Sequence, residues 1–238
     1  MDGIYRENLI ISADDFGLNE KTNDNILQLM KLGKLDRVSV MIGGKFRKEQ
    51  IEELLDSGIK LDIHLHVGTV ADWNRKNQKK ENLIFRTIRF LIEHLSDRSI
   101  RRKIFKDWEA QIIRFKEVLG KTPDGLNSHE YLHFFPPYFR VALRLSKKYG
   151  IGYFRFGRSG VIRTKNVGGI AALILRRLWF FNREHFKRHL VSSSDFLLSF
   201  DWIKNPEKFL DRISQKVKVE VVFHPERQKE YDFLLRKS

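Results

Sequence analysis

Two adjacent carboxylates and a glycine follow a run of β-forming residues near the start of the chain. Residues 10–17 read Ile-Ile-Ser-Ala-Asp-Asp-Phe-Gly, so Asp14 and Asp15 come at the end of a predicted strand. Neighbouring residues at a strand end point in different directions, so one aspartate can bind a cation while the other handles a proton. Two adjacent carboxylates repel each other unless a metal ion or hydrogen bonds compensate. The segment therefore predicts a metal site, although helix N-caps and turns also favour aspartate.

Five of the eight histidines lie at or just after predicted strand ends. They are His64 and His66 on one strand, His129 and His133 around a turn before two prolines, and His224 at the end of the last predicted strand. A single histidine is more often a hydrogen-bonded structural residue than a ligand. Together with the aspartate pair, these histidines indicate a carboxylate and two imidazoles that hold a catalytic divalent ion and leave room for water and substrate. The chain has no cysteine, so thiolate ligands and disulfides are excluded.

Apolar β-rich runs alternate with helical patterns, which predicts an α/β fold on a mainly parallel sheet. The predicted strands span residues 9–13, 37–42, 60–66, 125–128, 152–156, 190–193 and 218–224, and the predicted helices residues 20–32, 48–57, 83–95, 100–119, 138–149 and 206–215. The pattern fits a doubly wound sheet or a barrel. Because the candidate residues follow strand ends, we expect a barrel-like site at one rim. The polar, lysine-rich residues 72–82 are predicted to form a mobile rim loop.

Several different short motifs follow one another along the chain. They are Ser12-Ala13-Asp14-Asp15-Phe16-Gly17, Asn23 with Ile26, Ser39-Val40-Met41, Ile63-His64-Leu65, Gln111-Ile112 with Phe115, Ser128-His129 with His133, Arg155, and Glu220 with His224-Pro225. In these motifs the chain resembles the YdjC-like carbohydrate deacetylases, also called the chitooligosaccharide deacetylase family. The resemblance implies one domain over residues 1–238, a distorted (β/α) barrel of the polysaccharide-deacetylase kind, and hydrolysis of an N-acetyl group from an amino sugar.

The resemblance also implies roles for individual residues. Asp15, His64 and His129 are implied as ligands of one divalent metal ion, Zn²⁺ or Mg²⁺, and Asp14 is implied as the general base. A metal ion would stabilise the developing oxyanion while Asp14 takes the proton of the attacking water. His224 is the candidate residue that donates a proton to the leaving amine or orients it.

Three further residues are assigned to the substrate side of the site. His133 could bind substrate or fill the same proton-donating role as His224. His66 has no counterpart in the family pattern, so it is either substrate-facing or structural. Arg155 matches a family arginine and could orient Asp14 or contact substrate, although an arginine at a strand end is often only a surface ion pair.

The chain departs from the family pattern in three places. Asn127 stands where the family usually has aspartate, which keeps a hydrogen bond but removes a charge that could tune His129. Residues 130–132 read Glu-Tyr-Leu where another histidine is common, and Glu226 replaces the usual glycine after His-Pro. No proposed ligand is lost, so these changes bear on the substrate more than on the reaction.

The formal net charge of +15 suits nucleic acid, an anionic membrane or an acidic substrate. The basic clusters at residues 101–103, 147–148, 176–177 and 183–188 accompany no recognisable nucleic-acid-binding motif, so we expect a solvated basic surface and no nucleic-acid partner. Residues 170–181 are apolar and basic at once. A buried helix is the favoured interpretation, and the alternative is a helix lying on an anionic membrane, which would indicate a lipid-linked amino sugar.

The length of 238 residues with 42% hydrophobic content suits one globular domain. No secretory signal or membrane-spanning run is evident, so a cytoplasmic protein is expected. The family resemblance also implies a homodimer. Two other functions are kept as alternatives: a different metal-assisted hydrolase such as a phosphoesterase, and a basic nucleic-acid-binding or membrane-binding protein with a vestigial site.

Overall fold

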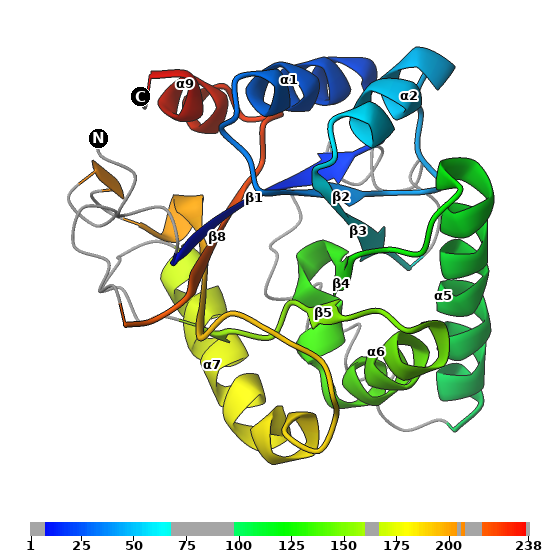
Figure 1. The fold of residues 1–238 in the computed structure, drawn as a ribbon. Helices are drawn as coiled ribbons and strands as arrows, with labels where there is room; N and C mark the ends of the chain where they lie inside the picture. The colour runs from blue at the N-terminus through cyan, green and yellow to red at the C-terminus, as the bar shows by residue number, and fades with distance from the viewer. Residues whose placement is uncertain (1–7, 68–97, 160–166, 204–205, 208–215, 237–238) are drawn as a thin grey trace.

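The computed structural model describes residues 8–67, 98–159, 167–203, 206–207 and 216–236 (Figure 1). In these residues eight strands form one parallel sheet: β1 Leu9–Phe16, β2 Arg37–Val40, β3 Lys60–Leu65, β4 Gly125–Ser128, β5 Tyr153–Phe154, β6 Arg158–Ser159, β7 Phe196–Ser199 and β8 Val219–Phe223. The α-helices are α1 Glu20–Lys31, α2 Lys48–Asp56, α5 Arg98–Leu119, α6 Pro136–Tyr149, α7 Val167–Phe186 and α9 Gln228–Arg236, with 3₁₀ helices η2 His129–Phe134 and η3 Phe200–Trp202.

The sheet curls into a distorted barrel. Its strand order is β5-β4-β3-β2-β1-β8-β7-β6, so β5 and β6 stand at opposite ends of the order although only residues 155–157 separate them in the chain. The two ends must therefore meet. Tyr153 of β5 bridges Ser192, and the Phe154 amide donates a hydrogen bond to the Ser192 carbonyl at 2.9 Å. The helices lie around the outside (Figure 1), which confirms the barrel-like α/β prediction.

Both faces of the central strands are buried, but they differ in chemistry. In β1, Ile11 and Ala13 belong to the apolar core beneath the helices, whereas Ser12 contacts Glu220 of β8. In β3, Leu61 and Ile63 alternate with buried Asp62 and His64 in the same way. Because successive side chains of a strand point to opposite faces, one face packs against the helices and the other lines the barrel interior with polar groups.

Most predicted elements are present, with three differences. Residues 190–193 do not form a strand, because only the isolated bridge at Ser192 lies there and β7 begins later, at Phe196. Strand β6 and helix α9 were not predicted. The predicted loop 72–82, the helix 83–95 and residues 208–215 of the last predicted helix lie outside the described residues.

The expectation of a buried helix for residues 170–181 is wrong. They lie in α7, and Leu173 and Phe181 are 50% and 76% exposed. Among the described residues, no helix combines the length and the apolar character that crossing a membrane requires.

Candidate functional site

The two adjacent aspartates lie in a β-bulge of β1. Ala13 pairs with Val38 and Phe16 with Val40, so β1 has one more residue than β2 across this stretch. The extra residue lies at Asp14 and Asp15, and Asp15 has a φ of 70°, in the left-handed region that aspartate tolerates better than most residues. The bulge therefore lets the two carboxylates reach different partners, as the division of roles requires.

The turn that follows depends on a glycine. Gly17 has a φ of 104°, and a Cβ at this position would lie 2.7 Å from the Met41 carbonyl oxygen. Its amide donates to the Asn23 side chain at 2.7 Å. These contacts fix the backbone directly after Asp15.

The three predicted metal ligands meet at the carboxyl ends of the strands, which we call the catalytic edge. Asp15 Oδ1 lies 3.3 Å from His64 Nε2 and 3.1 Å from His129 Nδ1, and the two histidine nitrogens are 3.3 Å apart. Ligand atoms that each lie about 2.0–2.1 Å from one ion are separated by about 3 Å. The spacing and chemistry of the three donors therefore fit one divalent ion.

His64 is held for ligation by its neighbour strand. Its Nδ1 lies 2.5 Å from Asn127 Oδ1, and the Asn127 amide donates to Ser39 Oγ at 2.9 Å. An Nδ1–H bonded to an amide oxygen leaves Nε2 free to bind a metal. Asn127 thus tunes His64, not His129 as expected. Although burial disfavours the charged ring, the negative charges of Asp14 and Asp15 raise the pKa of His64.

Asp14 is paired with Arg155 inside the barrel. Arg155 donates from Nη1 to Asp14 Oδ2 at 2.7 Å and from Nε to Glu220 Oε1 at 2.7 Å. Burial alone would raise the pKa of Asp14, but the arginine charge outweighs it and the pKa falls to about 2. Asp14 Oδ1 is buried and has no hydrogen-bond partner in the described part of the chain. Arg155 is fully buried, so it is not a surface ion pair, and its hydrogen bond holds one oxygen of Asp14 in place.

Glu220 is the centre of the network that supports Arg155. Its Oε1 also accepts from Ser12 Oγ at 2.7 Å, and its Oε2 accepts from Tyr153 Oη at 2.6 Å. Sequence reasoning noted Glu220 in the family motif but assigned it no role. A glutamate in the middle of an apolar strand is a signal that could have found it, since a buried carboxylate needs partners.

His224 directly follows β8, next to the strand that carries Asp14. Its amide donates to Glu230 Oε2 at 2.7 Å, and its Nδ1 lies 3.7 Å from the same oxygen. Burial would lower the pKa of His224, but Glu230 raises it to about 9, so the ring is protonated at neutral pH. The charge of His224 in turn helps to lower the pKa of Asp14, which places the two groups within electrostatic reach.

Two residues near the site were not among the predicted site residues. Glu226 has one buried carboxylate oxygen without a partner in the described residues, and burial together with the charge of Asp15 raises its pKa to about 7. Tyr131 follows Glu130, and both have positive φ values, 55° and 52°. Burial and the charge of Asp14 raise the pKa of Tyr131, so its hydroxyl stays protonated near Asp14. Both positions were noted only as departures from the family pattern.

His133 and His66, which were assigned to the substrate side, both make hydrogen bonds within the protein. His133 Nδ1 accepts from Ser128 Oγ and its Nε2 donates to the Arg155 carbonyl, both at 2.7 Å, so both ring nitrogens are used within the protein. Burial lowers the pKa of His133 to about 3. The backbone of His66 is held by Gln111, which accepts from its amide at 3.1 Å and donates to its carbonyl at 2.8 Å.

The chain is similar to one known protein family and to several named proteins. The model of the YdjC-like protein family matches residues 8–237. A carbohydrate deacetylase of Mus musculus is 23% identical over 156 residues, which are 63% of this chain and 50% of the mouse protein. A chitooligosaccharide deacetylase of Salmonella paratyphi B is 25% identical over 162 residues, 67% of this chain and 63% of that protein. The chain thus spans about half to two thirds of these relatives.

A solved structure supports the fold. A proposed cellobiose-phosphate cleavage protein of Enterococcus faecalis V583 superposes with a TM-score of 0.55 at 20% identity, covering 91% of this chain and 80% of that one. Because the family match extends over nearly the whole sequence, the chain belongs to the YdjC-like protein family.

Proposed function

We propose that this protein is a metal-dependent hydrolase that removes the N-acetyl group from an amino sugar, either a chitooligosaccharide or a lipid-linked N-acetylglucosamine derivative. The observation that carries the proposal is the meeting of Asp15, His64 and His129 within 3.3 Å of one another, beside the ionised carboxylate of Asp14. The names of the mouse and Salmonella relatives support the substrate class.

Asp15, His64 and His129 would hold the ion, which we propose to be Zn²⁺ or Mg²⁺. Asp14 is ionised at any working pH, but a carboxylate with a pKa of about 2 is a weak base. The attacking water must therefore be made more acidic, which, together with polarisation of the acetamide carbonyl, is the chemistry that a bound divalent ion supplies.

The protein's own groups handle the protons. The unpartnered Oδ1 of Asp14 accepts a proton as water attacks the acetamide carbon, while Arg155 holds the other oxygen. Protonated His224 then donates a proton to the nitrogen as the C–N bond breaks, and acetate and the free amine leave. The charge of Glu230, whose Oε2 lies 3.7 Å from His224 Nδ1, keeps His224 protonated for this step.

Acetate release tests the proposal. The purified protein is expected to release acetate from chitooligosaccharides. Acetate release should stop after chelation and recover when one divalent ion is restored. Phosphate release from phosphoesters without acetate release would contradict the deacetylase assignment. Acetate release that survives complete chelation would contradict metal dependence.

The rate is expected to fall at alkaline pH as His224 loses its proton. Burial and the charge of Arg227 lower the pKa of His224, but Glu230 and Glu226 raise it to about 9 instead of the usual 6.5. Asp14 also lies within electrostatic reach of His224. A bound cation adds positive charge, so the alkaline limb of kcat should lie at or below about pH 9. The raised pKa also stabilises the fold, fully below about pH 6.5 and less as the pH rises through about 9.

The substitution Glu230→Gln tests whether the titration of His224 causes the alkaline limb of kcat. Loss of the Glu230 charge is expected to move the alkaline limb to lower pH while bound metal is unchanged. An unchanged pH profile would show that His224 is not the group that titrates.

Arg155→Met is expected to destabilise the protein by about 3–5 kcal/mol, because Asp14 and Glu220 would lose their buried cation. The free energy of unfolding from urea titration measures this. The control Arg47→Met removes exposed pairs with Glu20 and Asp24 and should cost less than about 1 kcal/mol. A loss at Arg155 no larger than in the control would contradict the network.

A further inference from the structure

The outward face of α7 is apolar where a surface helix is normally polar. Its exposed large side chains are Ile170, Leu173, Ile174, Phe180 and Phe181. Positions 170, 173, 174 and 181 follow helical spacing and share one side, whereas Ala172, Leu175 and Asn182 on the other side are buried against the barrel. Asn182 donates to the Phe134 carbonyl at 2.8 Å, which fixes which side faces inward.

Cations accompany these apolar side chains. They are Arg176, Arg177, Arg183, Lys187 and Arg188, in α7 and the residues after it. Glu184, the one acidic residue in α7, is already paired with Arg183 at 3.3 Å and Lys187 at 3.0 Å. The Arg183 guanidinium lies 4.1 Å from the centre of the Phe180 ring. We call this surface the α7 face.

A basic groove lies between α5 and α6, and α6 packs against both α5 and α7. It has a volume of about 450 Å³, and its lining includes Phe105 and the cations Arg101, Arg102, Lys106, Arg140 and Arg144. Helix α6 contains no acidic residue. Burial and the charges of His189 and Arg140 lower the pKa of His185 in α7, so Arg140 of the groove lies within electrostatic reach of α7.

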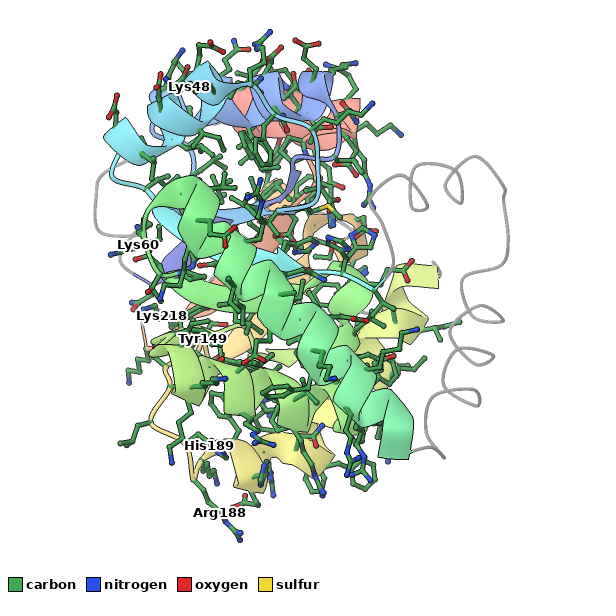
Figure 2. All side chains as sticks on the ribbon, turned by 90° about the vertical axis from the view of Figure 1, so that its right-hand side faces the viewer. Lys48, Lys60, Tyr149, Arg188, His189 and Lys218 are labelled. Atoms are coloured by element: carbon green, nitrogen blue, oxygen red, sulfur yellow. The ribbon has the colours of Figure 1, made fainter. Side chains whose placement is uncertain are left out.

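Both features begin near the catalytic edge. Helices α6 and α7 follow strand ends and return the chain toward strand starts, so Arg140 and Leu173, in the first halves of these helices, lie nearer to the side where the strands end. Figure 2 shows the opposite edge, where Lys60 and Lys218 stand at or before strand starts and Arg188 follows α7.

We propose that the α7 face and the basic groove dock this protein on a bilayer that contains anionic phospholipids. Exposed leucine and phenylalanine side chains can enter the boundary between headgroups and acyl chains, while the surrounding cations contact lipid phosphates. Nucleic acid would use the cations but leave the apolar side chains in water. A second copy seated face to face would bring the arginines of both copies together, which is unfavourable.

Vesicle co-sedimentation tests the inference without any substrate, so its result is separate from that of the proposed function. The whole protein should bind vesicles of equimolar phosphatidylcholine and phosphatidylglycerol and should not bind phosphatidylcholine alone. Leu173→Ser with Phe181→Ser should weaken binding roughly 10- to 100-fold, since two apolar anchors are lost. Arg176→Glu with Arg177→Glu should weaken it by at least roughly tenfold.

Matched controls lie on the far helices. Leu32, 52% exposed at the end of α1, and exposed Lys48 of α2 are replaced as Leu32→Ser and Lys48→Glu, and both variants should bind as the unchanged protein does. Equal binding to neutral vesicles, or binding insensitive to the α7 variants, would overturn the inference. A dimer that Phe181→Ser dissociates, or RNA binding that depends on Phe181, would also overturn it. The same holds if the serine variants only lower the melting temperature and leave vesicle binding unchanged.

Discussion

Asp15→Asn is expected to abolish bound metal and acetate release together. Asp15 is the one carboxylate among the three clustered donors, and its Oδ1 is the atom that lies within 3.3 Å of both imidazoles. Asparagine keeps the volume and tolerates the φ of 70°, so the bulge should persist while the charge is lost. The loss of metal affinity should exceed the roughly 10- to 100-fold that follows loss of a supporting partner.

Metal content and affinity are measured by elemental analysis and by competition with a coloured chelator. His64→Ala and His129→Ala should behave in the same way as Asp15→Asn. Asp24→Asn, at an exposed position of α1, is the control and should keep both metal and turnover. One tightly bound ion in each Asp15→Asn chain would show that the ion lies elsewhere.

The meeting of Asp15, His64 and His129 could be expected because strand ends gather in a parallel fold, although the family resemblance, and not the spacing, singled out these three residues. Asp15, His64 and His129 come from distant parts of the chain, yet each follows or ends a predicted strand, and the strands all end at one edge. Strand pairing then determines the neighbours of these residues. His64 lies beside Asn127 because β3 and β4 pair in register.

The partners within the barrel could not be predicted in this way. Which strands face each other across the interior depends on how the sheet closes, and β6 and β7 are short strands whose position follows from that closure. The sequence therefore leaves two roles open for Arg155, orienting Asp14 or contacting substrate, and its bonds to Asp14 and Glu220 favour the first. The partners of His133, Ser128 Oγ and the Arg155 carbonyl, could not be predicted for the same reason.

The alternation of polar and apolar residues in the strands is a further signal in the sequence. Ser12 and Asp14 in β1, and Asp62 and His64 in β3, recur with a period of two among apolar residues. That pattern predicts a polar interior between the strands. Which carboxylate meets the arginine and which meets the histidines depends on the bulge in β1, and a one-residue irregularity is invisible in composition.

Asp14→Asn is expected to keep bound metal but to lower kcat by roughly 10²- to 10⁴-fold, the usual contribution of a general base. The amide oxygen of the substituted side chain can still accept from Arg155, so the pairing geometry is largely kept while the proton acceptor is lost. Metal content is measured beside acetate release for the same preparation, and urea unfolding reports any loss of stability.

The contrast with Asp15→Asn decides whether the two neighbouring aspartates divide their roles. Asp14 contacts Arg155 through one oxygen and leaves Oδ1 without a partner among the described residues, whereas Asp15 faces the two imidazoles. If Asp14 is the base, its loss removes turnover at full metal occupancy, and if it is a ligand, metal and turnover fall together. Full turnover in Asp14→Asn would instead leave water activation to another carboxyl, and Glu226, whose pKa the charge of Asp15 helps to raise, is a candidate.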